Sequence, residues 1–220
     1  WLGFVSTIGM LSGVSINTAH ELGHKNTAVE SWLAKIALAP VAYGHFYTEH
    51  NRGHHKNVAT PHDPASARMG EPFWRFLVRT AGGSARSALD IEKRRMARKN
   101  RSFWSVHNEV LQSWGMTIVL WGALMFAFGI ELLPFLVLQA IIGASLLEAV
   151  NYAEHYGLLR KKLESGRYER CQPEHSWNND HIVTNIMLFH LQRHSDHHAH
   201  PTRRYQSLRH FDEAPQLPTG

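Results

Sequence analysis

The sequence is poor in cysteine, and this scarcity limits the chemistry that it can support. Its 220 residues include one cysteine, Cys171, so an intrachain disulfide framework and an all-thiolate metal site are both excluded. Iron–sulfur clusters and the glycine-rich fingerprints of flavin and nicotinamide sites are also missing. A metal would have to be held by nitrogen and oxygen, and electrons for a redox reaction would come from another protein.

Charged side chains are nearly absent from three long stretches. Residues 1–19 have no charged side chain, and residues 31–48 carry only Lys35 and His45. The longest stretch, 114–147, has a single ionisable side chain. As one helix rising about 1.5 Å per residue it would reach roughly 50 Å, far beyond a bilayer core of about 30 Å. It must therefore be two helices, and Gly129–Pro134 is the expected break.

These stretches predict an all-α, integral-membrane helical bundle with two transmembrane hairpins. Polar regions at about 50–107 and 153–220 are expected to form a cytoplasmic helical part. The chain begins with Trp1 and has no signal-peptide pattern, so we expect a single domain over residues 1–220, truncated at both ends. A soluble helical hairpin is the alternative to a membrane span. The expected hydrophobic segments are about 1–19, 31–48, 113–130 and 132–152.

Basic residues are concentrated in one region. The formal net charge is +5, and ten Lys or Arg lie between Arg68 and Arg101. A basic run can indicate nucleic acid, but no base-reading motif accompanies this one. Beside hydrophobic segments, the positive-inside rule explains it as a cytoplasmic loop.

Histidine is unusually frequent, with 17 residues, and eight of them lie in three clusters, two at the polar ends of hydrophobic segments and one in the C-terminal polar region. Residues four apart on a helix share a face, as in HELGHK and EHNRGHH; HSDHH has the same property at spacings of three and four. In the second cluster we expect His50 and His54 to share a face, with His55 about 100° away. The eight clustered histidines are His20, His24, His50, His54, His55, His194, His197 and His198.

Eight imidazoles are too many for one metal. A zinc site takes about four ligands and a non-haem iron about five or six, so the clusters predict two metals. Imidazole suits iron, zinc, copper and nickel, and the spacing leaves the metal open. A single-zinc protease would explain HELGHK and leave the other clusters unexplained. Apart from His155, which ends the fourth hydrophobic segment, the remaining histidines are expected to be structural or to orient the ligands: His45, His62, His107, His175, His181, His190, His200 and His210.

Four motifs together resemble a known family. HELGHK, EHNRGHHKNVATPHDPASAR, NYAEHYGL and LQRHSDHHAHPTRRYQSL are similar to those of the bacterial alkane 1-monooxygenases, within the integral-membrane di-iron oxygenases and desaturases. The resemblance covers almost all of residues 1–220. His62 stands where that pattern has an acidic residue. The resemblance implies a ligand set of His20, His24, His50, His54, His55, His155, His194, His197 and His198.

The resemblance also implies an activity. Two non-haem irons, cycling between Fe2+ and Fe3+, would use O2 to hydroxylate the terminal carbon of a medium- or long-chain n-alkane to a 1-alkanol. Rubredoxin, served by rubredoxin reductase, would donate electrons. The location would be the bacterial inner membrane, as a multi-pass protein with the metals on the cytoplasmic side. Lipid would be a partner and nucleic acid would not.

Two carboxylates and two rival functions complete the expectations. Glu154 and Asp196 are expected to orient ligand imidazoles through the second ring nitrogen. A fatty-acyl desaturase or lipid hydroxylase would use the same metals on another substrate. A non-catalytic membrane metal-binding or transport protein would instead place histidines within the hydrophobic helices, whereas these lie at helix ends.

Overall fold

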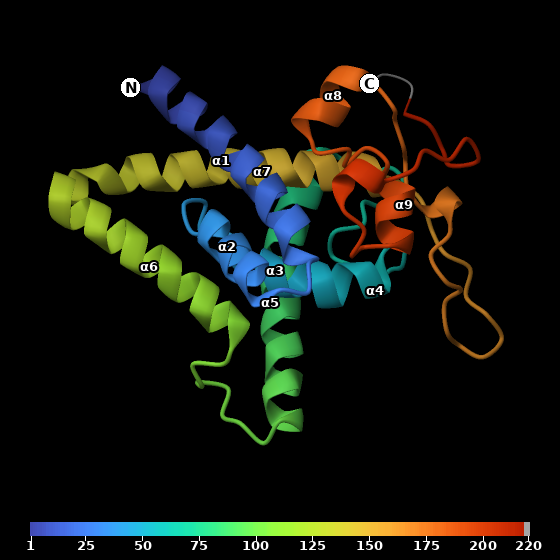
Figure 1. Cartoon of the computed structure of the whole chain (residues 1–220), viewed down its shortest axis with the longest axis horizontal. Helices are drawn as coiled ribbons and strands as arrows, with labels where there is room; N and C mark the ends of the chain where they lie inside the picture. The colour runs from blue at the N-terminus through green and yellow to red at the C-terminus, as the bar shows by residue number, and fades with distance from the viewer. Residues whose placement is uncertain (218–220) are drawn as a thin grey trace. The chain divides into compact units, whose positions relative to one another are not determined.

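The computed structural model describes residues 1–217, and over these the chain is helical (Figure 1). Two isolated bridges are the only β-type pairing in that range. The all-α prediction is confirmed. A π-helical turn covers His50–His54, and short 3-10 turns cover Ile130–Leu132, Pro173–His175 and Tyr205–Ser207. The α-helices are α1 (Leu2–Gly23), α2 (Ala28–Leu38), α3 (Phe46–Glu49), α4 (His55–Asn57), α5 (Phe73–Arg98), α6 (Glu109–Phe128), α7 (Leu133–His155), α8 (Ile182–Met187) and α9 (His194–Ala199).

Internal contacts divide the chain into two compact units. The first unit comprises Trp1–Gly53 and Gly82–Leu147, and the second comprises His54–Ala81 and Glu148–Gly220. The long helices α5 and α7 each contribute residues to both units. The expectation of one domain over the whole chain stays a prediction.

Among residues 1–217, three helices are long and apolar enough to cross a bilayer: Leu2–Gly23, Glu109–Phe128 and Ile130–His155. The last two are separated at Gly129, whose φ of +91° is a conformation that glycine adopts without strain. Pro134 follows in the first turn of α7, where its missing N–H costs no hydrogen bond. The protein is a membrane protein.

The expected segment at 31–48 differs from the structure. Its helix, α2, ends at Leu38 after 11 residues, roughly 16 Å at 1.5 Å per residue, which is too short to span a bilayer. Pro40 cannot continue the helix, and Ala42 turns the chain with a φ of +53° before α3 begins. The predicted first transmembrane hairpin is therefore wrong, because only its first helix is long enough to span.

In the first unit, α1 and α7 approach very closely. A Cβ on Gly9 would lie 2.7 Å from Ile142, and a Cβ on Gly143 would lie 3.2 Å from the backbone nitrogen of Gly13. Small residues four apart let helix backbones meet in this way. Figure 1 shows the two helices crossing. This contact fixes the path of α1, which ends at the first histidine cluster.

A buried polar link strengthens the same packing. The Ser12 hydroxyl donates to the side-chain oxygen of Gln139 at 2.7 Å, and the Gln139 amide donates to the Pro40 carbonyl at 2.6 Å. The turn that ends α2 is thereby tied to α1 and α7. A hydrogen-bonded amide in an apolar interior costs little, whereas an unpaired one would be expensive.

Candidate metal centre

Three histidines meet in the first unit. His20 lies in the last turn of α1, His24 caps that helix, and His50 opens the π-helical turn. All three side chains are buried. The ring of His50 lies 4.5 Å from that of His20 and 5.0 Å from that of His24, measured between centroids, and the His20 and His24 rings are 5.0 Å apart. The HxxxH spacing of α1 therefore brings both of its imidazoles to one place, as predicted.

The π-helical turn separates the histidines of the second cluster. A π turn bonds residue i to i+5, so each residue is rotated relative to its place in an α-helix, and such turns often occur at functional sites. His50 lies with the histidines of α1, whereas His54, in the second unit, lies with His155 and His198. The expectation that His50 and His54 share a face is wrong, because it assumed α-helical winding.

Four buried histidines meet in the second unit: His54, His155, His194 and His198. One ring nitrogen of each lies within 4.8 Å of those of the other three. The Nε2 atom of His194 is 3.0 Å from that of His155 and 2.9 Å from that of His198. We refer to these residues as the four-histidine group. They come from three places in the sequence, with His155 at the end of α7.

His197 faces another direction from its neighbours on α9. Its Nε2 atom is 3.1 Å from the Nε2 atom of His55, which is half-buried. His194 and His198, one helical turn apart, both belong to the four-histidine group. The histidines of α9 were expected on one face, and the structure divides them between two neighbouring groups.

The four-histidine group fits a metal ion. Nitrogen ligands about 2.1 Å from a metal and at right angles lie about 3.0 Å apart, which matches the two Nε2 separations around His194. Burial, with further contributions from His55 and His194, holds the pKa of His198 well below its usual range. A neutral imidazole keeps a lone pair for a metal. The group is therefore suited to binding a metal through nitrogen.

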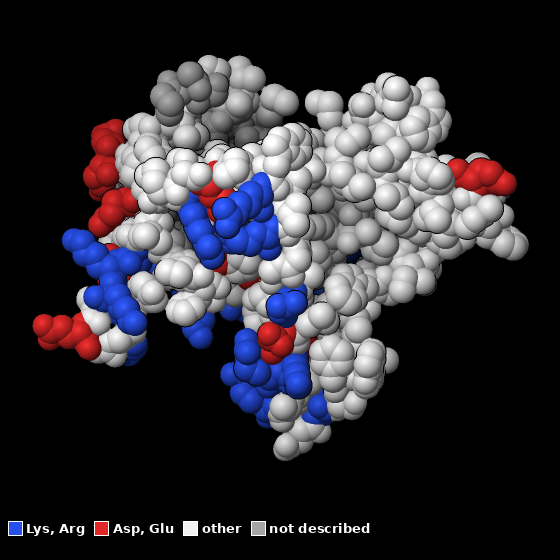
Figure 2. Space-filling view, turned by 180° about the vertical axis from the view of Figure 1, so that it is seen from behind, with Lys and Arg blue, Asp and Glu red and all other residues white. Residues whose placement is uncertain are grey.

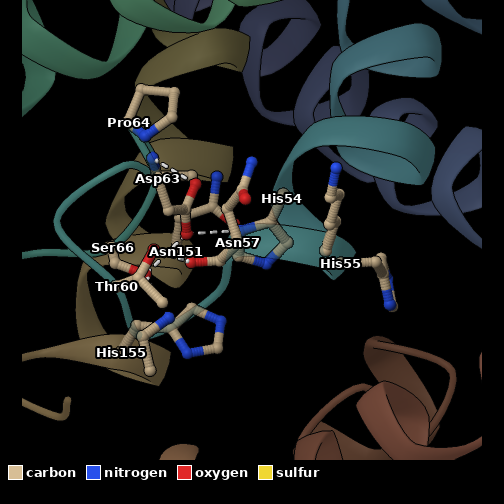
Figure 3. Close-up of polar contacts among 12 residues, drawn as sticks. His54, His55, Asn57, Thr60, Asp63, Pro64, Ser66, Asn151 and His155 are labelled. Carbon is tan, nitrogen blue, oxygen red and sulfur yellow. Dashed lines mark hydrogen bonds and ion pairs between the residues drawn. The ribbon is translucent and has the colours of Figure 1, made fainter. Parts of the chain in front are cut away.

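Asp63 orients one member of the group. Its carboxylate accepts a hydrogen bond from Nδ1 of His54 at 2.9 Å, and a second from the Ser66 hydroxyl at 2.5 Å (Figure 3). Burial opposes ionisation of Asp63, but the His54 ring and the Ser66 hydroxyl outweigh it, so the pKa of Asp63 is lowered. With Nδ1 committed to Asp63, His54 presents Nε2 to the group. Figure 3 also shows His55 pointing away from this contact.

Two further groups face the outer nitrogens of the same histidines. The backbone carbonyl of His175 lies 3.4 Å from Nδ1 of His155, and a carboxylate oxygen of Glu154 lies 3.2 Å from Nδ1 of His194. Glu154 therefore lies near a histidine of the group, and its expected role in orienting an imidazole stays a prediction. His175, expected to be structural, takes part through its backbone.

Asp196 is placed differently from the expectation. Its carboxylate accepts hydrogen bonds from the Arg203 guanidinium and, at 2.9 Å, from the backbone N–H of Arg209. These contacts fasten the segment after α9, and they leave no role in orienting an imidazole. An arginine within reach pairs with a carboxylate more strongly than a neutral ring does, which explains the difference.

Asn178 holds α9 in place. Its side-chain oxygen accepts from both the backbone N–H and the hydroxyl of Ser195, each at 3.0 Å. Its own backbone N–H donates to the Pro215 carbonyl, and its carbonyl accepts from Leu217. The histidine helix is thereby tied to two distant segments. Sequence reasoning missed both Asn178 and Asp63; the signal for Asp63 was the DPA turn, in which an Asp side chain bonds the backbone two residues on, as it does to Ala65.

Most of the other histidines lie outside the clusters. His62, His107, His181 and His200 are exposed, whereas Asp63, next to His62, is buried. His45 is buried, and burial lowers its pKa to about 4.

Known proteins resemble this chain along its whole length. The fatty acid desaturase family profile matches residues 1–219. An alkane 1-monooxygenase of Acinetobacter baylyi is 54% identical over 97% of the chain and 52% of its own length. One from Alcanivorax borkumensis is 52% identical over 100% of the chain and 54% of its own length. The xylene/toluene monooxygenase hydroxylase component of Pseudomonas putida is 28% identical over 99% of the chain and 58% of its own length.

The chain thus spans about half the length of the curated relatives that it matches. Its match to the family profile covers nearly every residue and includes all the clustered histidines. A membrane protein with buried, converging imidazoles agrees with that match. The chain belongs to the fatty acid desaturase family.

Proposed function

We propose that the protein catalyses the O2-dependent terminal hydroxylation of medium- or long-chain n-alkanes to 1-alkanols. The observation that carries this proposal is the convergence of four buried imidazoles at the end of a helix able to span a membrane. Relatives over half identical to this chain are named alkane 1-monooxygenases. A fatty acid desaturase of the same family would need the same kind of metal site, so the substrate rests on the relatives.

We propose that two non-haem irons are held by nine histidines. When bound, the irons would supply the reduction of O2, with one oxygen atom going to the alkane and the other to water. The proposed ligands are His20, His24, His50, His54, His55, His155, His194, His197 and His198.

The surrounding residues would keep these imidazoles neutral and correctly turned. Asp63 accepts a hydrogen bond from Nδ1–H of His54, and the His175 carbonyl faces Nδ1 of His155. The Nε2 lone pairs of both rings are therefore available to a metal. A carboxylate oxygen of Glu154 lies 3.2 Å from Nδ1 of His194, and we propose that it helps to orient this ring as well. Partners of this kind typically change metal affinity about 10- to 100-fold. No protein nucleophile is required, and the chain's task is to bind, orient and exclude water.

An alkane offers no hydrogen bonds, so its binding must depend on burial of apolar surface, at about 0.8 kcal/mol per CH₂. Membrane-spanning helices such as α6 and α7 provide such surface, and the bilayer would supply the substrate. This chain has no redox fingerprint, so electrons would come from elsewhere, and the resemblance to alkane 1-monooxygenases implies rubredoxin, served by its reductase. We place the protein in the bacterial inner membrane with the metals on the cytoplasmic side, since the basic region Arg68–Arg101 fits the positive-inside rule.

The test is conversion of an alkane series, with octane and hexadecane, by cells that produce the protein. Terminal alkanols are expected from the wild type, and the His198→Ala variant should form none above background. His200→Ala is the matched control, because His200 lies two residues on and is exposed. Full activity of His198→Ala would remove this residue from the metal centre.

Product and metal analysis separate the rivals. Desaturated acyl chains without alkanol would favour a desaturase. Purified protein that holds zinc and almost no iron would favour a zinc enzyme or a metal-binding protein. The expected result is iron in the wild type, with less iron in His198→Ala and an unchanged content in His200→Ala.

A further inference from the structure

An open pocket of about 530 Å³ lies in the first unit, away from the histidines. It is formed by the last turns of α5, the loop that follows and the first turns of α6. Nothing in the proposed oxidation uses it. Its lining includes Asp90, Lys93, Phe103, Trp104, Leu111 and Trp114.

Hydrogen bonds hold the walls of this pocket in place. Asn108 caps α6 by accepting from the backbone N–H of Val110, and its amide donates to the Phe103 carbonyl at 2.9 Å. Arg95 of α5 donates to the His107 carbonyl at 2.6 Å. The loop is thus fastened to both helices, and the pocket is already formed without a ligand.

If α6 spans a bilayer, its first turns bring this pocket to the level of the lipid headgroups. It opens beside the first turns of α6, one of the helices able to span a bilayer, and α6 begins at Glu109. Trp104 is 79% exposed, although tryptophan is highly buried on average. Tryptophan is enriched where membrane meets water, because its ring is apolar and its N–H is polar. A phospholipid is therefore the ligand that this position would meet.

The two charges of the pocket select among phospholipids. Asp90 and Lys93 are exposed and one turn apart on α5, and within residues 1–217 neither forms an ion pair. A cation and an anion held side by side match a zwitterion that has both a phosphate and an ammonium group. Aromatic rings beside Asp90 would add cation–π attraction for the ammonium.

We propose that this pocket binds the phosphoethanolamine headgroup of a membrane phospholipid, with Lys93 on the phosphate and Asp90 on the ammonium. Phosphatidylglycerol has no ammonium for Asp90. The quaternary ammonium of phosphatidylcholine has no N–H to donate to it.

The surroundings provide a competing explanation that can be tested. Lys and Arg side chains gather around the end of α5 (Figure 2), and Arg94, Arg98, Lys99 and Arg101 are exposed there. If this diffuse charge governed lipid binding, anionic phosphatidylglycerol would be preferred, by roughly 1 kcal/mol per basic residue. The pocket predicts the opposite preference.

Native mass spectrometry of the delipidated protein, titrated with each of the three lipids at equal acyl composition, measures the preference. Wild type should retain phosphatidylethanolamine most strongly. Asp90→Asn should lower the affinity for phosphatidylethanolamine, relative to that for phosphatidylglycerol, by up to about fivefold. Lys93→Gln should weaken the binding of all three lipids by a similar factor. Trp104→Ala should reduce retention of phosphatidylethanolamine without reversing the order.

Matched controls replace exposed charges outside the pocket. Arg94→Gln lies next to Lys93, and Asp212→Asn removes a fully exposed carboxylate of the second unit, so neither should alter the ratio between lipids. Circular dichroism and metal content of each variant would show that folding is intact. A wild type that prefers phosphatidylglycerol, or an Asp90→Asn variant with an unchanged ratio, would overturn the proposal.

Discussion

Replacing Asp63 by asparagine would test whether a hydrogen-bonded carboxylate sets the metal affinity of the four-histidine group. One carboxylate oxygen of Asp63 accepts from the His54 ring and the Ser66 hydroxyl, and the other accepts from the Ala65 backbone N–H at 3.0 Å. Asparagine must put its NH₂ group at one of these oxygens. Either choice sets a donor against a donor, at Nδ1 of His54 or at the backbone of Ala65.

The expected loss of metal affinity for Asp63→Asn is about 10- to 100-fold, or about 1.4 to 2.7 kcal/mol. Ser66→Ala, which leaves the contact between Asp63 and His54 in place, should lower the metal affinity by less than about tenfold. Chelator competition with the purified protein measures both, and Asp90→Asn is the control, because Asp90 is exposed and lies in the first unit. An Asp63→Asn variant that binds metal as tightly as wild type would refute the reasoning.

Three further predictions concern stability. Gly9→Ala should cost about 1 to 3 kcal/mol, since its Cβ would clash where α1 meets α7, whereas Gly122→Ala has open space and should be neutral or stabilising in a denaturant titration. Because the folded pKa of His45 is depressed to about 4, the unfolded chain alone takes up this proton between about pH 6.5 and 4. As the pH is lowered from about 6.5 to 4, the free energy of unfolding should therefore fall by about 3 kcal/mol more in wild type than in His45→Leu, as measured by unfolding across that window. Arg95→Gln should lower the free energy of unfolding by about 3 kcal/mol in a denaturant titration, because it removes a bidentate partner from the fully buried Glu92. An unchanged midpoint would contradict this.

The helical class and the clustered histidines could be predicted from the sequence because both depend on local patterns. Charge-free length predicts spans, and spacing of three or four residues predicts a shared helical face. The same reasoning failed where winding or tertiary contact decided the result. The π-helical turn sends His50 and His54 to different histidine groups, and no periodicity rule announces a change from α to π winding.

Two other differences have similar causes. Residues 31–48 were expected to form one hydrophobic segment that Pro40 kinks or shortens, but α2 ends at Leu38, before Pro40, and the chain turns at Ala42. Asp196 was expected to face a histidine because it lies among three of them, yet Arg203 reaches it from the following segment. A side chain's partner in a folded protein often comes from outside its own motif, so adjacency in sequence predicts it poorly.

The tie between Asn178 and the segment at Pro215–Leu217 has a consequence for how the protein is made. Helix α9 supplies two of the four histidines in its group, and it is held by a residue whose backbone is bonded to this late segment. During synthesis the chain emerges from its N-terminus, so the histidines of α1 leave the ribosome almost two hundred residues before that fastening exists. The metal group of the second unit can therefore take its final geometry only after residue 217 has been made, so loading with metal would follow synthesis of the whole stretch from α1 to this segment.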